Sequence, residues 1–452
     1  MNNFDTITAI ATPPGDGGIG IIRISGPESF VITDQIFKTF NGNSCLSEKH
    51  GTFNFGKIVN KEGSVVDHAI VLIMRKPHSF TGDDTSEIQL HGGVFVLREV
   101  LSMILKLGAR LADNGEFSKR AFINGKIDLT QAEAICDLIS ARSERSAKIA
   151  INQLEGALSN EINYIYNMFL EIAANLETTI DFIEDELPDD VFNGIYNKFC
   201  ECELKLNELI HSWNEGKALR DGLVVSILGK PNAGKSTLFN KFLGYDRTII
   251  SNIEGTTRDT IEENYILNGC PIKIIDTAGL RETKCLIEAE GVKRTEKVIK
   301  NSDFLIYVVD ASTEIDQLEL DRINSFSKNK TLVILNKIDQ GKIVNINDSI
   351  EISLFDNNSI KVVKNQLYKL IEKNLNLNFS DILISERHKS ILEEVNKEII
   401  IIKKLFNDNP ETNAVIICNH LGIVLNILGE ITGKVYHDEL LENIFSRFCI
   451  GK

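Results

Sequence analysis

Three short motifs between residues 229 and 339 constrain the fold of this 452-residue chain more than any other feature of its sequence. They are Gly-Lys-Pro-Asn-Ala-Gly-Lys-Ser at 229–236, Asp-Thr-Ala-Gly at 276–279 and Asn-Lys-Ile-Asp at 336–339. Each motif follows a short apolar run, at 223–228, 272–275 and 331–335. Such runs are typical of buried strands, and residues 236–242 predict the start of a helix. We therefore expect a parallel sheet that carries a phosphate-binding loop.

The side chains of these motifs suit a guanine nucleotide and Mg²⁺. In the first motif, Lys235 can meet the β- and γ-phosphate oxygens while Ser236 coordinates Mg²⁺. In the second, Asp276 can hold Mg²⁺ through water, and the following glycine can offer its N–H to the γ-phosphate. In the third, Asp339 can accept the N1–H and the exocyclic amine of guanine, a donor pair that adenine lacks. The three motifs together predict a GTPase.

Composition is that of a soluble protein with about three domains. Apolar residues make up 43% of the chain, which is enough for several packed cores. No uninterrupted apolar run reaches the roughly 18 residues of a membrane span, and residues 1–11 do not resemble a signal peptide. We expect a cytoplasmic protein without membrane attachment. The close pair Cys200 and Cys202 lacks the neighbouring ligands of a zinc site, so structural thiols are expected.

The net charge of −15 is unevenly distributed. Residues 1–126 are neutral and residues 217–380 carry +1, whereas the segments 127–216 and 381–452 together carry −16. An acidic surface repels phosphate backbones, so this region is expected to dock a basic protein partner rather than nucleic acid. A solvated acidic helix surface that serves solubility would account for the same charge.

The pattern along the chain predicts a multidomain protein of mixed α/β and α+β class. Alternating strands and helices over 217–380 predict a P-loop GTPase domain with helices on both faces of a parallel sheet. Helical segments flank it at 126–216 and 381–452. Apolar residues recur every three or four positions from Leu154 to Ile180, as on one long helix. We expect the two helical segments to pack together, with the GTPase domain inserted between them.

The amino-terminal residues 1–125 predict a separate α+β domain. Strand-like stretches occur at 19–24, 69–74 and 87–90 between turns rich in Gly and Pro. Residues 15–20 fit the dinucleotide-binding pattern Gly-x-Gly-x-x-Gly. That pattern has to open a helix, whereas here it leads into the strand-like stretch, so we reject it as a dinucleotide site.

Hydrolysis poses a problem that the three motifs do not solve. Many GTPases place a glutamine just after the Asp-x-x-Gly motif to orient water, but here that residue is Leu280. Leucine neither donates nor accepts a hydrogen bond. Another group must position the water, and either an arginine or a monovalent cation near the phosphates must balance the transition-state charge.

Motifs along the whole chain resemble the MnmE family, also called TrmE, of potassium-activated tRNA-modification GTPases. In the GTPase region these are Asn232, Ser-Asn-Ile-Glu-Gly-Thr-Thr-Arg-Asp at 251–259 and Asp-Thr-Ala-Gly-Leu-Arg-Glu at 276–282. Elsewhere they lie at 10–15, 80–84, 91–93, 115–117, 124–129, 131–134, 428–433 and in the carboxy-terminal Cys-Ile-Gly-Lys at 449–452. The resemblance departs at Ser353-Leu354, which replaces the guanine-contacting Ser-Ala-Lys and leaves nucleotide affinity open.

At the GTPase site the resemblance implies roles for residues that the motifs alone do not assign. It places K⁺ among the Asn232 and Thr256 side chains and the carbonyls of Ser251 and Ile253, and Mg²⁺ on Ser236 and Thr257. It implies catalytic roles for Glu288, which would position water, and for Lys235 and Arg258. Without the motif, Glu288 would be taken for an exposed helix glutamate. The implied GTP-binding residues are Asn232, Ala233, Gly234, Lys235, Ser236, Thr237, Ser251, Asn252, Ile253, Glu254, Gly255, Thr256, Thr257, Asp276, Thr277, Ala278, Gly279, Asn336, Lys337 and Asp339.

For the amino-terminal domain the resemblance implies a reduced folate, such as 5-formyltetrahydrofolate, and a homodimer. The matching positions are Arg23, Glu87, Lys126 and the terminal Lys452. A carboxylate suits the amide edge of a pteridine, and cations suit its glutamate tail. Composition alone would have treated Arg23 and Lys126 as surface charges.

Two functions follow from this reading. In the first, the chain hydrolyses GTP and, in a heterotetramer with an FAD-dependent MnmG-like partner, adds a (carboxymethyl)aminomethyl group to C5 of the wobble uridine of certain tRNAs. In the second, it is an Era-like ribosome-assembly switch. An Era-like protein should carry a basic RNA-binding module, which neither the neutral nor the acidic region resembles.

Overall fold

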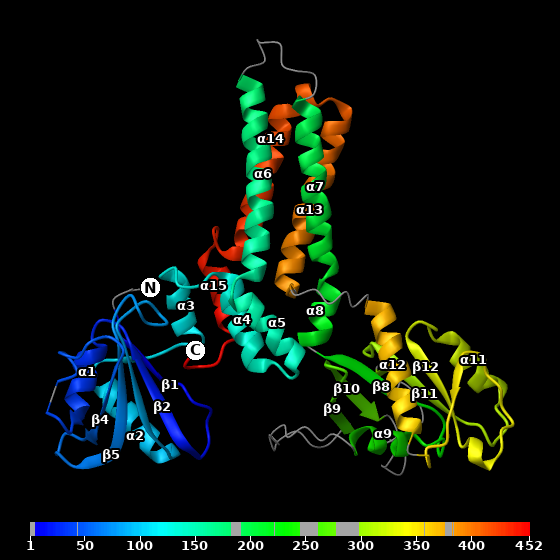
Figure 1. Cartoon of the computed structure of the whole chain (residues 1–452), viewed down its shortest axis with the longest axis horizontal. Helices are drawn as coiled ribbons and strands as arrows, with labels where there is room; N and C mark the ends of the chain where they lie inside the picture. Colours follow the sequence, from blue (N-terminus) through cyan, green and yellow to red (C-terminus); the bar gives the residue numbers. More distant parts are fainter. Residues whose placement is uncertain are drawn as a thin grey trace. The chain divides into compact units, whose positions relative to one another are not determined.

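The structure is a computed structural model that describes residues 5–42, 44–181, 191–220, 222–244, 261–276, 298–356, 358–375, 382 and 384–452. The chain forms two compact units. The first comprises Met1–Cys136, Leu154–Asp185 and Lys404–Lys452, and the second comprises Asp137–Gln153 and Glu186–Lys403. Figure 1 shows the elements of both units, coloured along the sequence.

The first unit contains a seven-stranded sheet with the order β3-β4-β5-β6-β2-β1-β7. Its neighbouring strands are antiparallel except for β1 and β7, which are parallel. In this register Arg23 of β2 lies opposite Glu87 of β6. The strands are β1 (Ile7–Ile10), β2 (Gly17–Ser25), β3 (Phe37–Thr39), β4 (Thr52–Val59), β5 (Val65–Met74), β6 (Thr85–Gly92) and β7 (Arg110–Leu111).

One face of this sheet packs on the helices α1 (Ser29–Ile36) and α2 (Val94–Lys106), as Figure 1 shows. A third helix, α3 (Glu116–Ile123), buries Phe117 against Ile7 and Ala9 of β1. The α+β class expected for this part of the chain is confirmed. The three predicted strand-like stretches lie in β2, β5 and β6, so the glycine pattern at 15–20 does lead into a strand.

The helices of the first unit are α4 (Leu129–Ser140), which runs on across the boundary between the units, α6 (Ala157–Asp181), α14 (Pro410–Thr432) and α15 (Asp438–Phe445). The helices α6 and α14 lie side by side (Figure 1). The prediction of one long helix from Leu154 was wrong at its start. Leu154 ends the preceding helix α5 (Glu144–Leu154), and a turn separates it from α6. The apolar spacing of four runs across this turn, so periodicity alone does not reveal it.

Helix α14 is the one described helix that is long and apolar enough to be compared with a membrane span. It has 23 residues and reaches a mean hydropathy of 1.8, so by length and composition it is capable of crossing a membrane. Its residues Leu421, Val424 and Leu428 are fully buried, and it packs along α6. A core helix of a globular protein passes the same length and hydropathy test. Polar residues such as Asn419 and His420 interrupt its apolar run.

The helices of the second unit are α5, α7 (Val191–His211), α8 (Trp213–Arg220), α9 (Lys235–Leu243), α11 (Gln317–Ser325), α12 (Ser359–Leu375) and most of α13 (Glu386–Asp408). An ion pair joins Glu203 of α7 to Lys403 of α13. Helices from before and after the inserted region therefore contact one another here, as α6 and α14 do in the first unit. The expected packing of the two helical segments is confirmed.

The second unit also holds a six-stranded sheet with the order β13-β12-β11-β8-β10-β9. The strands are β8 (Leu223–Leu228), β9 (Ile261–Leu267), β10 (Cys270–Asp276), β11 (Phe304–Asp310), β12 (Thr331–Asn336) and β13 (Ser349–Glu351). The four predicted strands are β8, β10, β11 and β12. These four strands are parallel to one another, as predicted, and the strand β9, which was not predicted, adds an antiparallel edge next to β10. A hairpin turn at Asn268 and Gly269, with positive φ at both, directs this reversal.

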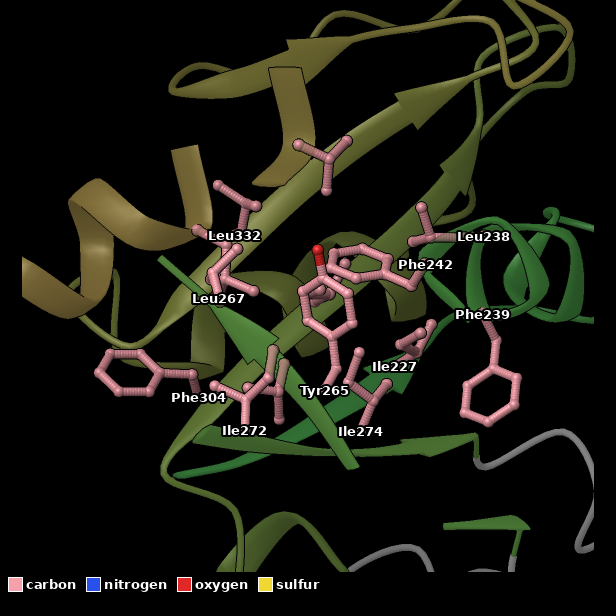
Figure 2. Packing of buried hydrophobic residues seen from close by; sticks show 14 of the residues in the cluster. Ile227, Leu238, Phe239, Phe242, Tyr265, Leu267, Ile272, Ile274, Phe304 and Leu332 are labelled. Atoms are coloured by element: carbon pink, nitrogen blue, oxygen red, sulfur yellow. The ribbon is translucent and has the colours of Figure 1, made fainter. Parts of the chain in front are cut away.

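Both faces of this sheet are covered by helices, as predicted. The helices α9 and α12 pack on one face, and Figure 2 shows Phe242 of α9 beside Tyr265 and Ile274 within that core. Leu305, Tyr307 and Val309 of β11 point to the other face, where they meet Ile323 of α11. Strands buried on both sides explain the continuous apolar runs of the sequence. The domain boundaries proposed at 125/126, 216/217 and 380/381 stay predictions.

Candidate nucleotide-binding site

The predicted phosphate-binding loop lies between β8 and α9, at the point where the strand order reverses. The neighbours of β8 are β10 and β11, which continue the sheet in opposite directions. Ligands of open α/β sheets bind at such a point, beyond the carboxyl ends of the strands. The helix α9 begins at Lys235, directly after the loop. The N-terminus of a helix presents backbone N–H groups and a positive dipole end, which favour an anion.

Lys235 begins α9 and is only 8% exposed. Its Nζ donates a hydrogen bond to the Lys230 carbonyl across the loop, at 2.7 Å. The preceding Gly234 has a φ of +105°, and a Cβ there would lie 2.3 Å from Nδ2 of Asn336. Only glycine permits this approach, so the loop and the third motif are held in contact.

Ser236 and Asp276 form the candidate Mg²⁺ site. The Ser236 hydroxyl donates to Oδ2 of Asp276 at 3.1 Å. Asp276 is 3% exposed at the carboxyl end of β10. Hydroxyl and carboxylate oxygens are the donors that Mg²⁺ prefers, so these two residues fit the ion. The other expected ligand, Thr257, lies outside the described residues.

In the third motif, Asn336 is buried and holds neighbouring segments together, whereas Asp339 is exposed. The Asn336 side chain donates from Nδ2 to the Ala233 carbonyl at 2.9 Å and accepts at Oδ1 from the Leu354 N–H at 3.1 Å. This buried residue thus ties the phosphate loop to the Ser353-Leu354 segment. Asp339 is exposed in the short 3-10 helix η2 (Ile338–Gln340).

Asp310 is a site residue that the sequence reasoning missed. It ends β11 between the first and third motifs and pairs with Nζ of Lys337 at 2.6 Å. Burial favours the neutral carboxyl, but hydrogen bonds from Lys337 and Ser312 outweigh it and lower the pKa of Asp310. Its position at the end of a predicted strand was a usable signal, because the other motifs also follow strand ends.

Lys230, inside the phosphate loop, was also missed as a functional residue. Its Nζ lies 2.6 Å from Oδ2 of Asp316 and 2.9 Å from Oε2 of Glu319, at the N-terminus of α11. The hydrogen bonds that Lys230 donates to these carboxylates raise its pKa. The same residue thus anchors the loop by its side chain and holds Lys235 by its carbonyl.

The described residues include only part of the predicted nucleotide site. The structure brings together Ala233, Gly234, Lys235, Ser236, Asp276 and Asn336, and it places Lys337, Asp339, Thr237 and Asn232 on adjoining segments. Asn232 is exposed and has a φ of +63°. The predicted residues Ser251, Asn252, Ile253, Glu254, Gly255, Thr256, Thr257, Arg258, Thr277, Ala278, Gly279 and Glu288 lie outside the described residues.

A second predicted site lies in the first unit, around Arg23. Its Nη2 is 2.7 Å from Oε1 of Glu87, and its Nη1 donates to the Gly451 carbonyl at 3.3 Å. The guanidinium also lies over the rings of Phe80 and Phe117. The structure therefore brings Arg23, Glu87 and the end of the chain before Lys452 together. Lys126 lies in an exposed turn after α3.

The fold and the geometry of the phosphate loop define a P-loop protein with a guanine-nucleotide-binding domain. Residues 6–126 match the family model of the GTP-binding protein TrmE N-terminus, and residues 129–449 match that of the MnmE helical domain. This chain belongs to the MnmE family.

Curated relatives match along the whole chain. The tRNA modification GTPase MnmE of Streptococcus mutans is 40% identical and covers 100% of this chain and 99% of its own length. The protein of the same name from Desulforamulus reducens is 39% identical, with 99% of both chains covered. A crystal structure of Aquifex aeolicus Era bound to GDP.AlF4- shares 29% identity over 32% of this chain and 56% of that chain, with a TM-score of 0.25.

Proposed function

We propose that this protein is a cytoplasmic, K⁺-dependent GTPase that acts in tRNA modification. With an FAD-dependent MnmG-like partner, it would add a (carboxymethyl)aminomethyl group to C5 of the wobble uridine of certain tRNAs. The full-length similarity to proteins named tRNA modification GTPase supports the modification role over an Era-like switch. The observation that carries the hydrolytic role is the contact between Ser236 and Asp276 beside the buried Lys235.

The described residues account for phosphate binding and orientation. Lys235 would exchange its hydrogen bond to the Lys230 carbonyl for the β- and γ-phosphate oxygens, and the first N–H groups of α9 would hold the same phosphates. Mg²⁺ on Ser236, with Asp276 behind it, would supply charge neutralisation. Asp339, in the exposed η2, would read the guanine edge.

The K⁺ proposal rests on Asn232 and on the family resemblance. Asn232 is exposed in the loop, and its side chain carries an amide oxygen, a hard donor that suits an alkali cation. The other implied ligands, Ser251, Ile253 and Thr256, lie outside the described residues. A cation there would balance transition-state charge where Leu280 replaces the usual glutamine.

The folate and homodimer proposals concern the amino-terminal domain. A carboxylate and a guanidinium beside two aromatic rings, at Arg23, Glu87, Phe80 and Phe117, fit a flat ligand with an amide edge and anionic tail. The sheet also exposes Phe53, Phe55 and Ile70 on neighbouring strands, 74%, 56% and 37% exposed. Such a patch is unusual for a monomer, and its occupant in our proposal is the same domain of a second chain.

The hydrolytic part is tested by turnover in KCl against NaCl at equal ionic strength. We expect GTP hydrolysis to fall by at least about tenfold in NaCl, because a K⁺ site built from several oxygens discriminates by size. Equal rates in the two salts would contradict the K⁺ dependence while leaving the GTPase role intact.

The modification part is tested separately, by analysing wobble uridines in tRNA from a strain that lacks this protein. Loss of the (carboxymethyl)aminomethyl group is expected, and the wild-type gene should restore it. Unchanged wobble uridines, combined with a defect in ribosome assembly, would favour the Era-like function instead.

A further inference from the structure

Asp310 lies beside the third motif and has no role in the function proposed above. It ends the strand β11, where it is the register partner of Asn336 at the end of β12. The N–H of Ala311, the next residue, donates to the Asn336 carbonyl at 2.8 Å. The end of β11 is therefore fastened to the residue that directly precedes Lys337, and Asp339 follows two residues later.

The two carboxylate oxygens of Asp310 have different partners. Oδ1 accepts hydrogen bonds from the hydroxyl and from the backbone N–H of Ser312, at 2.6 and 3.0 Å. Oδ2 accepts from Nζ of Lys337 at 2.6 Å. The side chains of Asp310 and Lys337 are only 18% and 24% exposed, so solvent screens this ion pair weakly. A short, charge-assisted contact of this kind holds its partners more firmly than an exposed ion pair does.

Lys337 is held at both of its ends. Its φ of +66° lies in the left-handed region, which a residue with a side chain seldom adopts. The backbone turns there from β12 into η2, and its carbonyl accepts from the Gln340 N–H at 3.0 Å. At the far end, Nζ is bound to Asp310. The four methylene groups between these ends therefore keep few of the rotamers that a free lysine has.

The proposed contact of Asp339 with guanine reaches only the edge of the base. Lys337 and Asp339 belong to the same turn, so a base bound at Asp339 also presents its flat face to this segment. Lysine stems cover apolar surface while the ammonium keeps its polar partner. A stem that is ordered before the ligand arrives binds at a lower cost in entropy than a mobile one.

We propose that Asp310 is a positioning residue for guanine binding, which acts by fixing Lys337 so that its methylene stem supports one face of the base. The inference rests on the proposed GTPase function and adds a residue that does not itself touch the nucleotide. It assigns Asp310 to the base rather than to the phosphates. The reason is that Asp310 binds Lys337 of the third motif, whereas Lys235 and Ser236 of the phosphate loop have other partners.

The variant Asp310→Asn keeps the shape of the side chain and breaks the contact with Lys337. Because the N–H of Ser312 can only donate, the amide oxygen is expected to stay on that side, and the amide NH2 group then faces the Lys337 ammonium. Titration calorimetry of the full chain with Mg²⁺ should show GTP bound about tenfold more weakly. Inorganic tripolyphosphate, which has no base, should bind with the wild-type affinity.

Steady-state kinetics and a control variant separate positioning from a general loss of structure. For Asp310→Asn, KM for GTP should rise while kcat stays unchanged, because the base contact is the same in the ground state and the transition state. Asp303→Asn is the matched control. Asp303 directly precedes β11, and its Oδ2 accepts from the Val224 N–H at 2.9 Å. This variant should bind both ligands as the wild type does.

A double-mutant cycle tests whether Asp310 acts through Lys337. Lys337→Met keeps an apolar stem but loses the ammonium, so the double variant should bind GTP no more weakly than Lys337→Met alone. Additive losses, equal weakening of GTP and tripolyphosphate, or wild-type GTP affinity in Asp310→Asn would each overturn the inference and leave the GTPase role standing. A wild-type chain that binds no GTP would overturn both.

Discussion

At the scale of single residues, the phosphate loop is held by contacts that involve no nucleotide. Lys230 joins the loop to α11 through Asp316 and Glu319, and its carbonyl accepts the hydrogen bond of Lys235. Glu319 is nearly buried, and its further hydrogen bond comes from the Tyr307 hydroxyl at 3.4 Å. Burial and the nearby Glu319 charge raise the pKa of Tyr307 to about 12, so this hydroxyl stays a donor at neutral pH.

Lys230→Met should weaken GTP binding by about five- to tenfold, or about 1.0–1.4 kcal/mol, because the loop loses its anchor to α11. Equilibrium binding of a fluorescent GTP analogue would measure this effect. Lys328→Met, which breaks an exposed ion pair of 3.6 Å with Asp348 in the same unit, is the control and should have no effect. Equal affinities of the two variants would show that the anchor does not position the loop.

At the scale of elements, the short helix α3 is fastened to β7 by the charges around Glu116. Asp5 and Glu116 both have pKa values lowered below their usual 3.8 and 4.5, because hydrogen bonds from Arg110 and Arg120 outweigh burial. A carboxyl with a lowered folded-state pKa stabilises the fold above its unfolded pKa. That contribution is lost as the pH falls through the folded-state pKa.

Glu116→Gln should therefore lower the stability of this domain at pH 7 by about 2 kcal/mol, because Arg110 and Arg120 lose one of their two carboxylate partners and keep only Asp5. The difference from the wild type should shrink as the pH falls from 5 to about 3. Scanning calorimetry of the full chain across this range would follow the affected transition. Glu99→Gln on the exposed face of α2 is the control. A difference that does not depend on pH would contradict the assigned role of the Glu116 charge.

The carboxy-terminal segment is the other element whose placement matters for a proposed site. Gly451 has a φ of +94°, and a Cβ there would lie 2.5 Å from the Ile10 carbonyl oxygen of β1. This close approach brings the Gly451 carbonyl to Arg23. A side chain at residue 451 would therefore displace the end of the chain from the proposed folate site.

Gly451→Ala should weaken binding of 5-formyltetrahydrofolate at least about tenfold, or about 1.4 kcal/mol, while GTP hydrolysis continues at the wild-type rate. Titration calorimetry with the folate measures the first quantity. Gly422→Ala in α14 is the matched control, since a Cβ there meets no atom within 4 Å. Wild-type folate affinity in the Gly451→Ala variant would argue that the chain end plays no part in this site.

At the scale of the whole molecule, charge is segregated along the chain. The two helical segments 127–216 and 381–452 together carry a charge of −16, whereas the rest of the chain carries +1, which gives the net charge of −15. Such a field accelerates association with a basic surface and is screened by salt. A solvated acidic surface that only aids solubility would give no such dependence.

We expect association with the MnmG-like partner to slow as ionic strength rises beyond about 0.15 M, where the Debye length is about 8 Å. Reversing the acidic cluster Glu184, Asp185, Glu186, Asp189 and Asp190 to Lys should slow association further, while GTP hydrolysis by the isolated protein continues. This cluster lies outside the described residues.

Stopped-flow association at several salt concentrations measures both effects. Unchanged association, with improved tRNA binding, would refute the docking role and support simple repulsion of RNA.

Much of the fold and of the nucleotide site could be predicted from local sequence. The strand ends at Asp276 and Asn336 were found because a buried parallel strand is a continuous apolar run and its motif follows directly. The edge strand β9 and the turn between α5 and α6 were not found, because neither changes the apolar periodicity. Asp310 and Lys230 were missed because their roles depend on partners 27 and 86 or more residues away.

The sequence by itself determined the order of the elements, the class of each domain and the chemistry available to the phosphate loop, because these depend on short-range patterns of apolar and glycine residues. The tertiary structure alone decided which distant groups meet. It set Arg23 against Glu87 and Gly451, and it tied Asn336 to both Ala233 and Leu354. Such contacts follow from strand register and helix packing, which bring together residues that are remote along the chain.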